Sequence, residues 1–167
     1  MNLKFYIKDL VYGADDGIIT TFAVVAGVVG AGLSSNIIII IGVASLFADG
    51  FSMAVSDYLG TKSEEVVLKE EHIRRRTKPL ASALYTFFAF VVAGSVPLVP
   101  YIFIGEGNEF LFTSVFTGVA LFLVGALRTL ATKKSFLAGG FETVIIGGIA
   151  ASIAFWIGEL ISAILIS

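Results

Sequence analysis

Five long apolar runs follow one another along the chain, at about residues 17–33, 37–60, 80–104, 110–130 and 143–166. Each run is close to the roughly 20 residues that an α-helix needs to cross the hydrocarbon core of a bilayer. The pattern therefore predicts an all-α integral membrane protein, in which residues 16–167 form one domain of five transmembrane helices.

Two segments outside these runs are polar enough to lie at the membrane surface or beyond it. Residues 1–15 mix apolar and charged positions, which predicts a short amphipathic segment at the interface, and they lack the pattern of a cleavable signal peptide. Residues 61–79, with the sequence TKSEEVVLKEEHIRRRTKP, contain no glycine and end at Pro79. We expect the second transmembrane helix to continue into this charged segment on the cytoplasmic side before it breaks.

The composition excludes several classes of protein. Of the 167 residues, 57% are hydrophobic and only 14% are charged, whereas a water-soluble domain has roughly a quarter charged residues. A net charge of −2 gives no reason to expect nucleic acid as a partner. The absence of cysteine excludes disulfides, thiolate metal sites and thiol catalysis.

The basic residues indicate the orientation in the membrane. All 11 Lys and Arg fall on one side if the five helices alternate in direction, and an excess of basic residues is typical of the cytoplasmic side. We therefore expect a cytoplasmic amino terminus and an external carboxyl terminus. The lack of targeting segments and long loops favours the plasma membrane of a prokaryote, or a vacuolar-type membrane if the source is a eukaryote.

Acidic residues inside the apolar runs are the strongest functional signal, because charged groups are costly in a bilayer and mark ion or proton paths. Asp49, Met53 and Asp57 recur every four residues and so lie on one helical face. Asp16 lies at the depth of Met53 if the first two helices run antiparallel from a turn near residues 34–35. The sequence thus predicts a ladder of carboxylates around one thioether.

This set of side chains favours a borderline transition metal. Carboxylates bind cations generally, but a thioether contributes nothing to Mg²⁺ or Ca²⁺, so Fe²⁺ or Mn²⁺ suits the mixed set. Carboxylates that exchange protons would couple metal movement to a proton gradient, and Asp49 and Glu142 are candidates for that path. In a simpler interpretation, Asp15 and Glu142 cap their helices and Glu159 reaches the outer interface.

The charged segment offers a second candidate site. Glu64, Glu65, Glu71 and His72 are expected to collect metal at the cytoplasmic face if the segment is functional, since Glu65 and His72 are two turns apart on one helical face. A charged run of this kind is more often a solvated helix face.

Small residues recur every fourth position in two of the runs, a spacing that lets membrane helices approach closely. They are Ala23, Gly27 and Ala31 in the first run, and Ala150, Ala154, Gly158 and Ser162 in the fifth. These two stripes fit either contacts within one protomer or a homodimer interface, and the pattern does not separate the two.

The first two runs resemble those of the vacuolar iron transporter family. The stretches DGIITTFAVVAGVVGA and ADGFSMAVSDYLGTKSE carry the resemblance most specifically. It is looser through the other three runs, which include GALRTL and IIGGIAASIAFWIGEL. The resemblance implies a five-span homodimer that exports Fe²⁺, and often Mn²⁺, from the cytosol in exchange for protons, along a path near the dimer interface.

By that resemblance Asp16 and Met53 correspond to the family's membrane aspartate and methionine, the same two residues that the depth argument pairs. Asp57 falls where many relatives carry an acidic or a small residue. The chain departs from the family in two places. Ser45 stands where many relatives have a glutamate, with Asp49 as the nearest acid, and the short charged segment replaces the long metal-binding helical domain of plant-type members.

The sequence therefore predicts a homodimeric, proton-coupled exporter of Fe²⁺ or Mn²⁺, with Asp16 and Met53 as primary ligands and Asp49 and Asp57 in support. It does not predict an enzyme: an aspartate dyad needs carboxylates about 3 Å apart, whereas Asp49 and Asp57 are roughly 12 Å apart along one helix. The alternatives are a passive cation channel and a nontransporting metal-sensing or assembly module that acts through residues 61–79.

Overall fold

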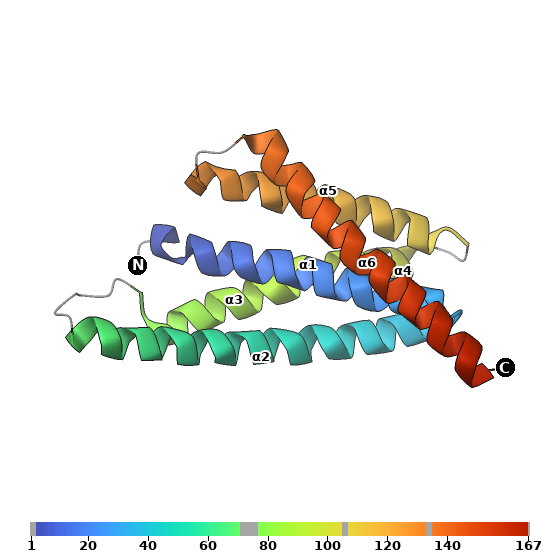
Figure 1. The fold of residues 1–167 in the computed structure, drawn as a ribbon, viewed down its shortest axis with the longest axis horizontal. Helices are drawn as coiled ribbons and strands as arrows, with labels where there is room; N and C mark the ends of the chain where they lie inside the picture. The colour runs from blue at the N-terminus through green and yellow to red at the C-terminus, as the bar shows by residue number, and fades with distance from the viewer. Residues whose placement is uncertain (1–2, 71–76, 105–106, 133–134, 167) are drawn as a thin grey trace.

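A computed structural model describes residues 3–70, 77–104, 107–132 and 135–166 of the chain. The described residues form helices joined by short connections (Figure 1). In chain order they are η1 (Leu3–Tyr6), α1 (Ile7–Gly30), α2 (Ser35–Glu70), α3 (Pro79–Gly94), η2 (Val96–Leu98), α4 (Val99–Phe103), α5 (Glu109–Thr132) and α6 (Phe136–Ile166).

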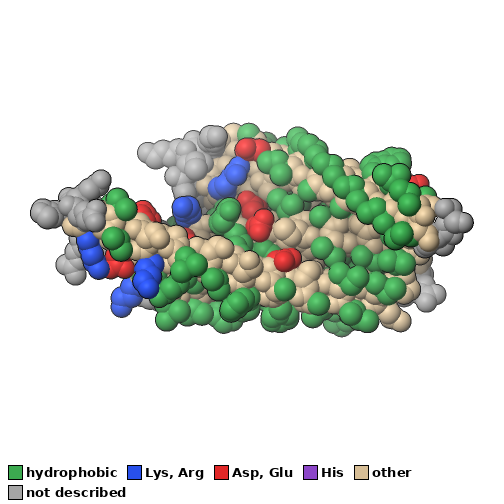
Figure 2. Space-filling view, turned by 60° about the horizontal axis from the view of Figure 1, so that its bottom comes forward, with side chains coloured by type: hydrophobic (Ala, Val, Ile, Leu, Met, Phe, Trp, Pro, Cys, Tyr) green, Lys and Arg blue, Asp and Glu red, His purple; other side chains and the backbone are tan. Residues whose placement is uncertain are grey.

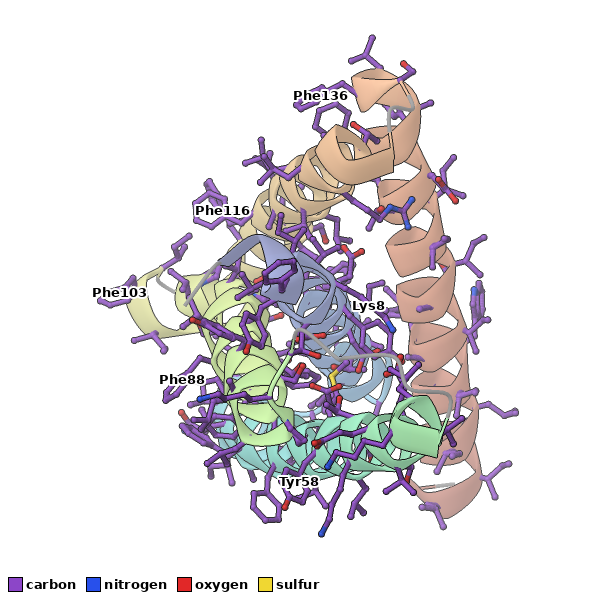
Figure 3. The ribbon with its side chains drawn as sticks, turned by 90° about the vertical axis from the view of Figure 1, so that its left-hand side faces the viewer. Lys8, Tyr58, Phe88, Phe103, Phe116 and Phe136 are labelled. Atoms are coloured by element: carbon purple, nitrogen blue, oxygen red, sulfur yellow. The ribbon has the colours of Figure 1, made fainter. Side chains whose placement is uncertain are left out.

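Five helical stretches are long and apolar enough to cross a membrane, with α3, η2 and α4 together making the third. This confirms the prediction of five candidate spans. Helix α1 occupies the centre, where it packs against α2 and α3 on one side and against α5 and α6 on the other (Figure 1). Phe88, Phe103 and Phe116 are exposed and point away from the bundle (Figure 3), as expected of side chains that face lipid.

The first helix begins earlier than the hydropathy pattern predicts. We expected a separate amphipathic segment over residues 1–15, but α1 starts at Ile7 and continues without a break to Gly30. The mixed pattern of this region has a packing explanation. Asp9 and Gly13 are buried whereas Tyr12 is exposed, and an added Cβ at Gly13 would lie 2.5 Å from the Thr86 carbonyl oxygen of α3.

The second helix continues beyond its apolar stretch into the charged segment. Helix α2 has 36 residues and runs past the apolar stretch to Glu70. Its last turns carry an exposed Glu65–Lys69 ion pair at 2.9 Å, a helical spacing that adds little to stability in water. Of the candidate capture residues, Glu71 and His72 lie outside the described residues.

The third span is not one regular helix, as the single run 80–104 led us to expect. Helix α3 ends at Gly94 and is followed by η2 and the short α4. Pro97 and Pro100 lie at this break, since proline has no backbone N–H to continue the helical hydrogen bonds. The carbonyl oxygen of Pro97 accepts a 3.1 Å hydrogen bond from the buried Thr113 hydroxyl of α5.

The two stripes of small residues face each other within the chain. An added Cβ at Gly27 would lie 3.4 Å from the Ala154 carbonyl oxygen, and one at Gly158 would overlap the Gly27 backbone. Further along, the Ser162 hydroxyl donates a 2.9 Å hydrogen bond to the Ala31 carbonyl oxygen. The structure thus settles the alternative that the sequence left open, because these stripes form the α1–α6 contact.

The described basic side chains gather at one end of the bundle (Figure 2). They belong to the start of α1, the end of α2, the residue before α3 and the end of α5, namely Lys8, Lys62, Lys69, Lys78 and Arg128. All of these helix ends lie together because consecutive helices run in opposite directions (Figure 1). We refer to this as the basic end of the bundle.

Candidate functional site

A cavity of about 670 Å³ lies near the basic end, between α1, α2 and the start of α3. Its acidic lining residues come from two helices, Asp9 and Asp16 from α1 and Asp57 and Glu64 from α2. Met53 contributes the thioether. Seen from this end, oxygen atoms and a sulfur atom lie between the three helices, with Lys8 beside them (Figure 3).

The two residues paired by the depth argument, Asp16 and Met53, both line this cavity. Each side chain is half-buried, and Met53 also packs against the apolar core that contains Val25 and Phe90. The carboxylate and the thioether therefore sit where the apolar interior of the bundle meets the acidic cavity. A cation at this position would have lost part of its water shell.

Asp57 is held by hydroxyl groups from two helices. The Thr86 hydroxyl of α3 donates a 2.9 Å hydrogen bond to Oδ2 of Asp57. The Thr61 hydroxyl, one turn further along α2, lies 3.4 Å from Oδ1. Both carboxylate oxygens thus accept a hydrogen bond, and hydrogen bonds to a charged acceptor are among the stronger ones in proteins.

Asp49 does not line the cavity. Its side chain is exposed on α2, although it is close enough to Asp16 for the two charges to interact. Of the capture candidates that the structure describes, Glu64 lines the cavity and Glu65 does not. The predicted ladder is therefore divided, with Asp16, Met53 and Asp57 on the cavity and Asp49 on the outer surface of the bundle.

Asp9 is a cavity residue that the sequence analysis missed. Its side chain is 9% exposed and accepts a hydrogen bond from the Ser82 hydroxyl of α3. The amphipathic pattern of residues 1–15 predicts an interfacial position for Asp9. The signal that could have found it is the spacing: Asp9 and Asp16, like Asp57 and Glu64, are seven residues apart, which returns to the same helical face after two turns.

The capping explanation of Asp15 and Glu142 is wrong. Helix α1 begins eight residues before Asp15, and α6 begins at Phe136, so neither side chain is at a helix start. Glu142 instead forms an ion pair with Arg128 of α5 at 2.8 Å. The charge of Asp15 also interacts with that of Arg128, and its buried Oδ1 has no hydrogen-bond partner among the described residues.

Among the residues that the structure describes, no three His, Cys, Asp or Glu side chains come together closely enough to hold a metal ion. The cavity instead offers separated carboxylates and one thioether along two helices.

Comparison with known proteins identifies this helical bundle. The model of the VIT family matches residues 7–78 and 65–159, which include every acidic residue of the cavity. The chain belongs to the VIT family. The two matched parts overlap over residues 65–78, which comprise the end of α2 and the charged segment before α3. Membership of this family, together with five candidate spans, makes the chain an integral membrane protein of a transporter family and not an enzyme.

Similarity to named VIT proteins extends over most of the chain. "Vacuolar iron transporter 1" of Eucalyptus grandis is 26% identical, with 94% of this chain and 87% of the relative aligned. The protein of that name from Arabidopsis thaliana is 27% identical, over 93% of this chain and 86% of the relative. "Vacuolar iron transporter" of Plasmodium berghei is 44% identical over 61 residues, which are 36% of this chain and 22% of the relative.

Proposed function

We propose that this protein exports Fe²⁺ or Mn²⁺ from the cytosol in exchange for protons. The observation that carries the proposal is the cavity at the basic end, on which a VIT-family chain brings Asp16, Met53 and Asp57 together. The names of its relatives, vacuolar iron transporters, support iron as the cargo. The basic end is the cytoplasmic end, since basic residues are enriched on that side of membranes.

In the proposed path the metal enters past Glu64 and loses water as it reaches Asp16 and Met53. These two side chains are the primary ligands, and Asp57 supplies a fixed negative charge beside them. A mixed carboxylate and thioether environment favours Fe²⁺ or Mn²⁺ over Mg²⁺ or Ca²⁺. Transport then requires that the bundle exposes the ligands alternately to the two sides of the membrane.

A homodimer would complete the site. Asp49 is exposed on the membrane part of α2, where contact of a carboxylate with lipid is costly. A second copy packed against this face of α2 would cover Asp49 and add its own ligands to the path. The separated ligands of a single protomer also favour this arrangement.

Protons would return through carboxylates that release metal. Asp49 is the candidate carrier beside the path, and Glu142 a second candidate near the cytoplasmic end of α6. Metal binding displaces protons from carboxylates, so a proton gradient would drive release on the outer side. The membrane is proposed to be the plasma membrane of a prokaryote, or a vacuolar-type membrane if the source is a eukaryote.

Anaerobic Fe²⁺ flux into proteoliposomes, with and without an imposed pH gradient, tests the proposal. We expect flux that follows the gradient and a matching movement of protons. Flux that ignores the gradient would identify a passive channel. Metal binding without flux under any condition would instead identify a nontransporting module, and the charged segment after α2 would then become the region to mutate.

Met53→Leu is expected to lower Fe²⁺ flux more than Mn²⁺ flux. Leucine has a similar volume, so the packing of α2 against the core should persist, while the soft sulfur ligand is lost. The ratio of the two fluxes, measured in the same proteoliposomes, reports the change. An equal loss for both metals would mean that Met53 acts through packing and not as a ligand.

A further inference from the structure

Helix α3 contributes no carboxylate to the cavity, but two of its hydroxyl groups bind carboxylates that line the cavity. Ser82 and Thr86 are one turn apart on the same helical face and are 1% and 0% exposed. Ser82 donates its hydrogen bond to Asp9 of α1. Thr86 donates its hydrogen bond to Asp57 of α2. One turn of α3 thus holds an acidic side chain from each of the other two helices of the cavity.

We infer that Ser82 and Thr86 are positioning residues for metal transport, which hold the carboxylates of Asp9 and Asp57 in the orientation that a passing cation meets. This inference rests on the proposed transport function and adds a role for α3 in it. Neither hydroxyl is assigned as a metal ligand. Each acts through the carboxylate to which it donates.

The contrast with hydroxyl groups that bond within their own helix supports this role. Buried or half-buried hydroxyls in helices usually donate to a backbone carbonyl one turn earlier in their own helix. Thr20, Ser114 and Thr143 do so here, at 2.7, 2.8 and 3.2 Å. Ser82 and Thr86 instead reach across to carboxylates of other helices, so local satisfaction of the hydroxyl does not explain their contacts.

The backbone of α3 is fixed where these hydroxyls lie. At Gly13 of α1 the absence of a side chain lets the Thr86 carbonyl oxygen approach closely, and one turn further Gly17 packs directly against the backbone of Phe90. Helices in such close contact have little freedom to slide or rotate. The hydroxyl of Thr86 therefore has a defined position at the junction of α1, α2 and α3.

The hydrogen bonds leave the carboxylates able to bind a cation. A carboxylate has about four lone-pair positions, and the two hydroxyls on Asp57 occupy only one on each oxygen. The remaining positions are available to metal in the cavity that Asp57 lines. Loss of the Thr86 hydrogen bond would let the carboxylate rotate, which weakens metal binding without removing the charge.

Thr86→Val tests the inference, since valine keeps the shape and removes the hydroxyl. We expect the KM for Fe²⁺ flux to rise by about tenfold, near the lower end of what a hydrogen bond to a charged group contributes, with little change in maximal flux. Thr86→Ser keeps the hydroxyl and is expected to restore the wild-type KM. Ser82→Ala is expected to raise the KM in the same way through Asp9.

Thr117→Val is the matched control. Thr117 of α5 is also fully buried, but its hydroxyl has no hydrogen-bond partner among the described residues, whereas that of Thr86 binds Asp57. We expect unchanged flux from this variant. Thermal unfolding in detergent, measured for every variant, separates an effect on transport from a loss of folded protein.

A double variant shows whether Thr86 acts through Asp57. In an Asp57→Ala background, which retains residual flux if Asp57 only supports the primary ligands, Thr86→Val is expected to have no additional effect on the KM. An additive increase, or a wild-type KM in Thr86→Val alone, would overturn the inference while wild-type flux still supports transport. Absence of flux in the wild-type protein would overturn the proposed function itself.

Discussion

Asp16→Asn is expected to abolish metal flux while leaving the fold intact. The amide has the same shape as the carboxylate, and Asp16 is half-buried on the wall of a cavity, so the substitution changes charge far more than packing. Removing one partner of a poorly solvated charge pair costs about 3–5 kcal/mol. If the bound cation loses this much stabilising free energy, flux should be at least about a hundredfold slower. Anaerobic Fe²⁺ flux in proteoliposomes measures it.

Glu159→Gln serves as the control for this prediction. Glu159 is also an acidic residue of a membrane helix, but it is exposed on α6 and lies away from the cavity. Its variant should transport at the wild-type rate. Wild-type flux in Asp16→Asn, with both proteins monodisperse and equally resistant to thermal unfolding, would remove the cavity as the metal path.

Gly158→Val is expected to prevent formation of a stable bundle. A side chain at this position overlaps the backbone of Gly27 in α1, and a backbone cannot move aside as a flexible side chain can. Overpacking against side chains typically costs about 1–3 kcal/mol, and we expect a greater loss here, because α1 and α6 must separate along the whole crossing. The yield of monodisperse protein and its midpoint of thermal unfolding in detergent report the effect.

Gly148→Val on the same helix is the matched control, since no atom lies within 4 Å of an added Cβ there. It should unfold at nearly the wild-type temperature. The pair of variants also tests the contact between Gly158 and α1 in solution. If Gly158 served contact between subunits instead of the α1–α6 contact, its variant would give a folded monomer in place of an unstable protein.

Part of the candidate site follows from spacing alone. A four-residue repeat predicts that Met53 and Asp57 share a face of α2, and counting from the interhelical turn predicts that Asp16 lies level with Met53. In the structure Asp16, Met53 and Asp57 all line one cavity. Asp49 has the same spacing but is exposed. The spacing predicts the relative direction of side chains on one helix but not the rotation of that helix against its neighbours, so it could not exclude Asp49 from the cavity.

The break after Gly94 and the early start of α1 show a similar limit. Hydropathy averages over a window, so it found the apolar run of residues 80–104 but not the change to η2 and α4 inside it. It likewise assigned residues 1–15 to the interface, although burial of Asp9 and Gly13 against α3 makes them part of the first long helix.

The sequence by itself determined the number of apolar helices, their alternating direction and the concentration of basic residues at one end. These properties depend on the local run of side chains and on the length of chain that crosses a bilayer. Only the tertiary structure decided that the small-residue stripes join α1 to α6, that Asp9 belongs to the cavity, and that Ser82 and Thr86 hold its carboxylates. Those contacts join residues more than 25 positions apart, and they depend on how closely packed helices rotate against one another.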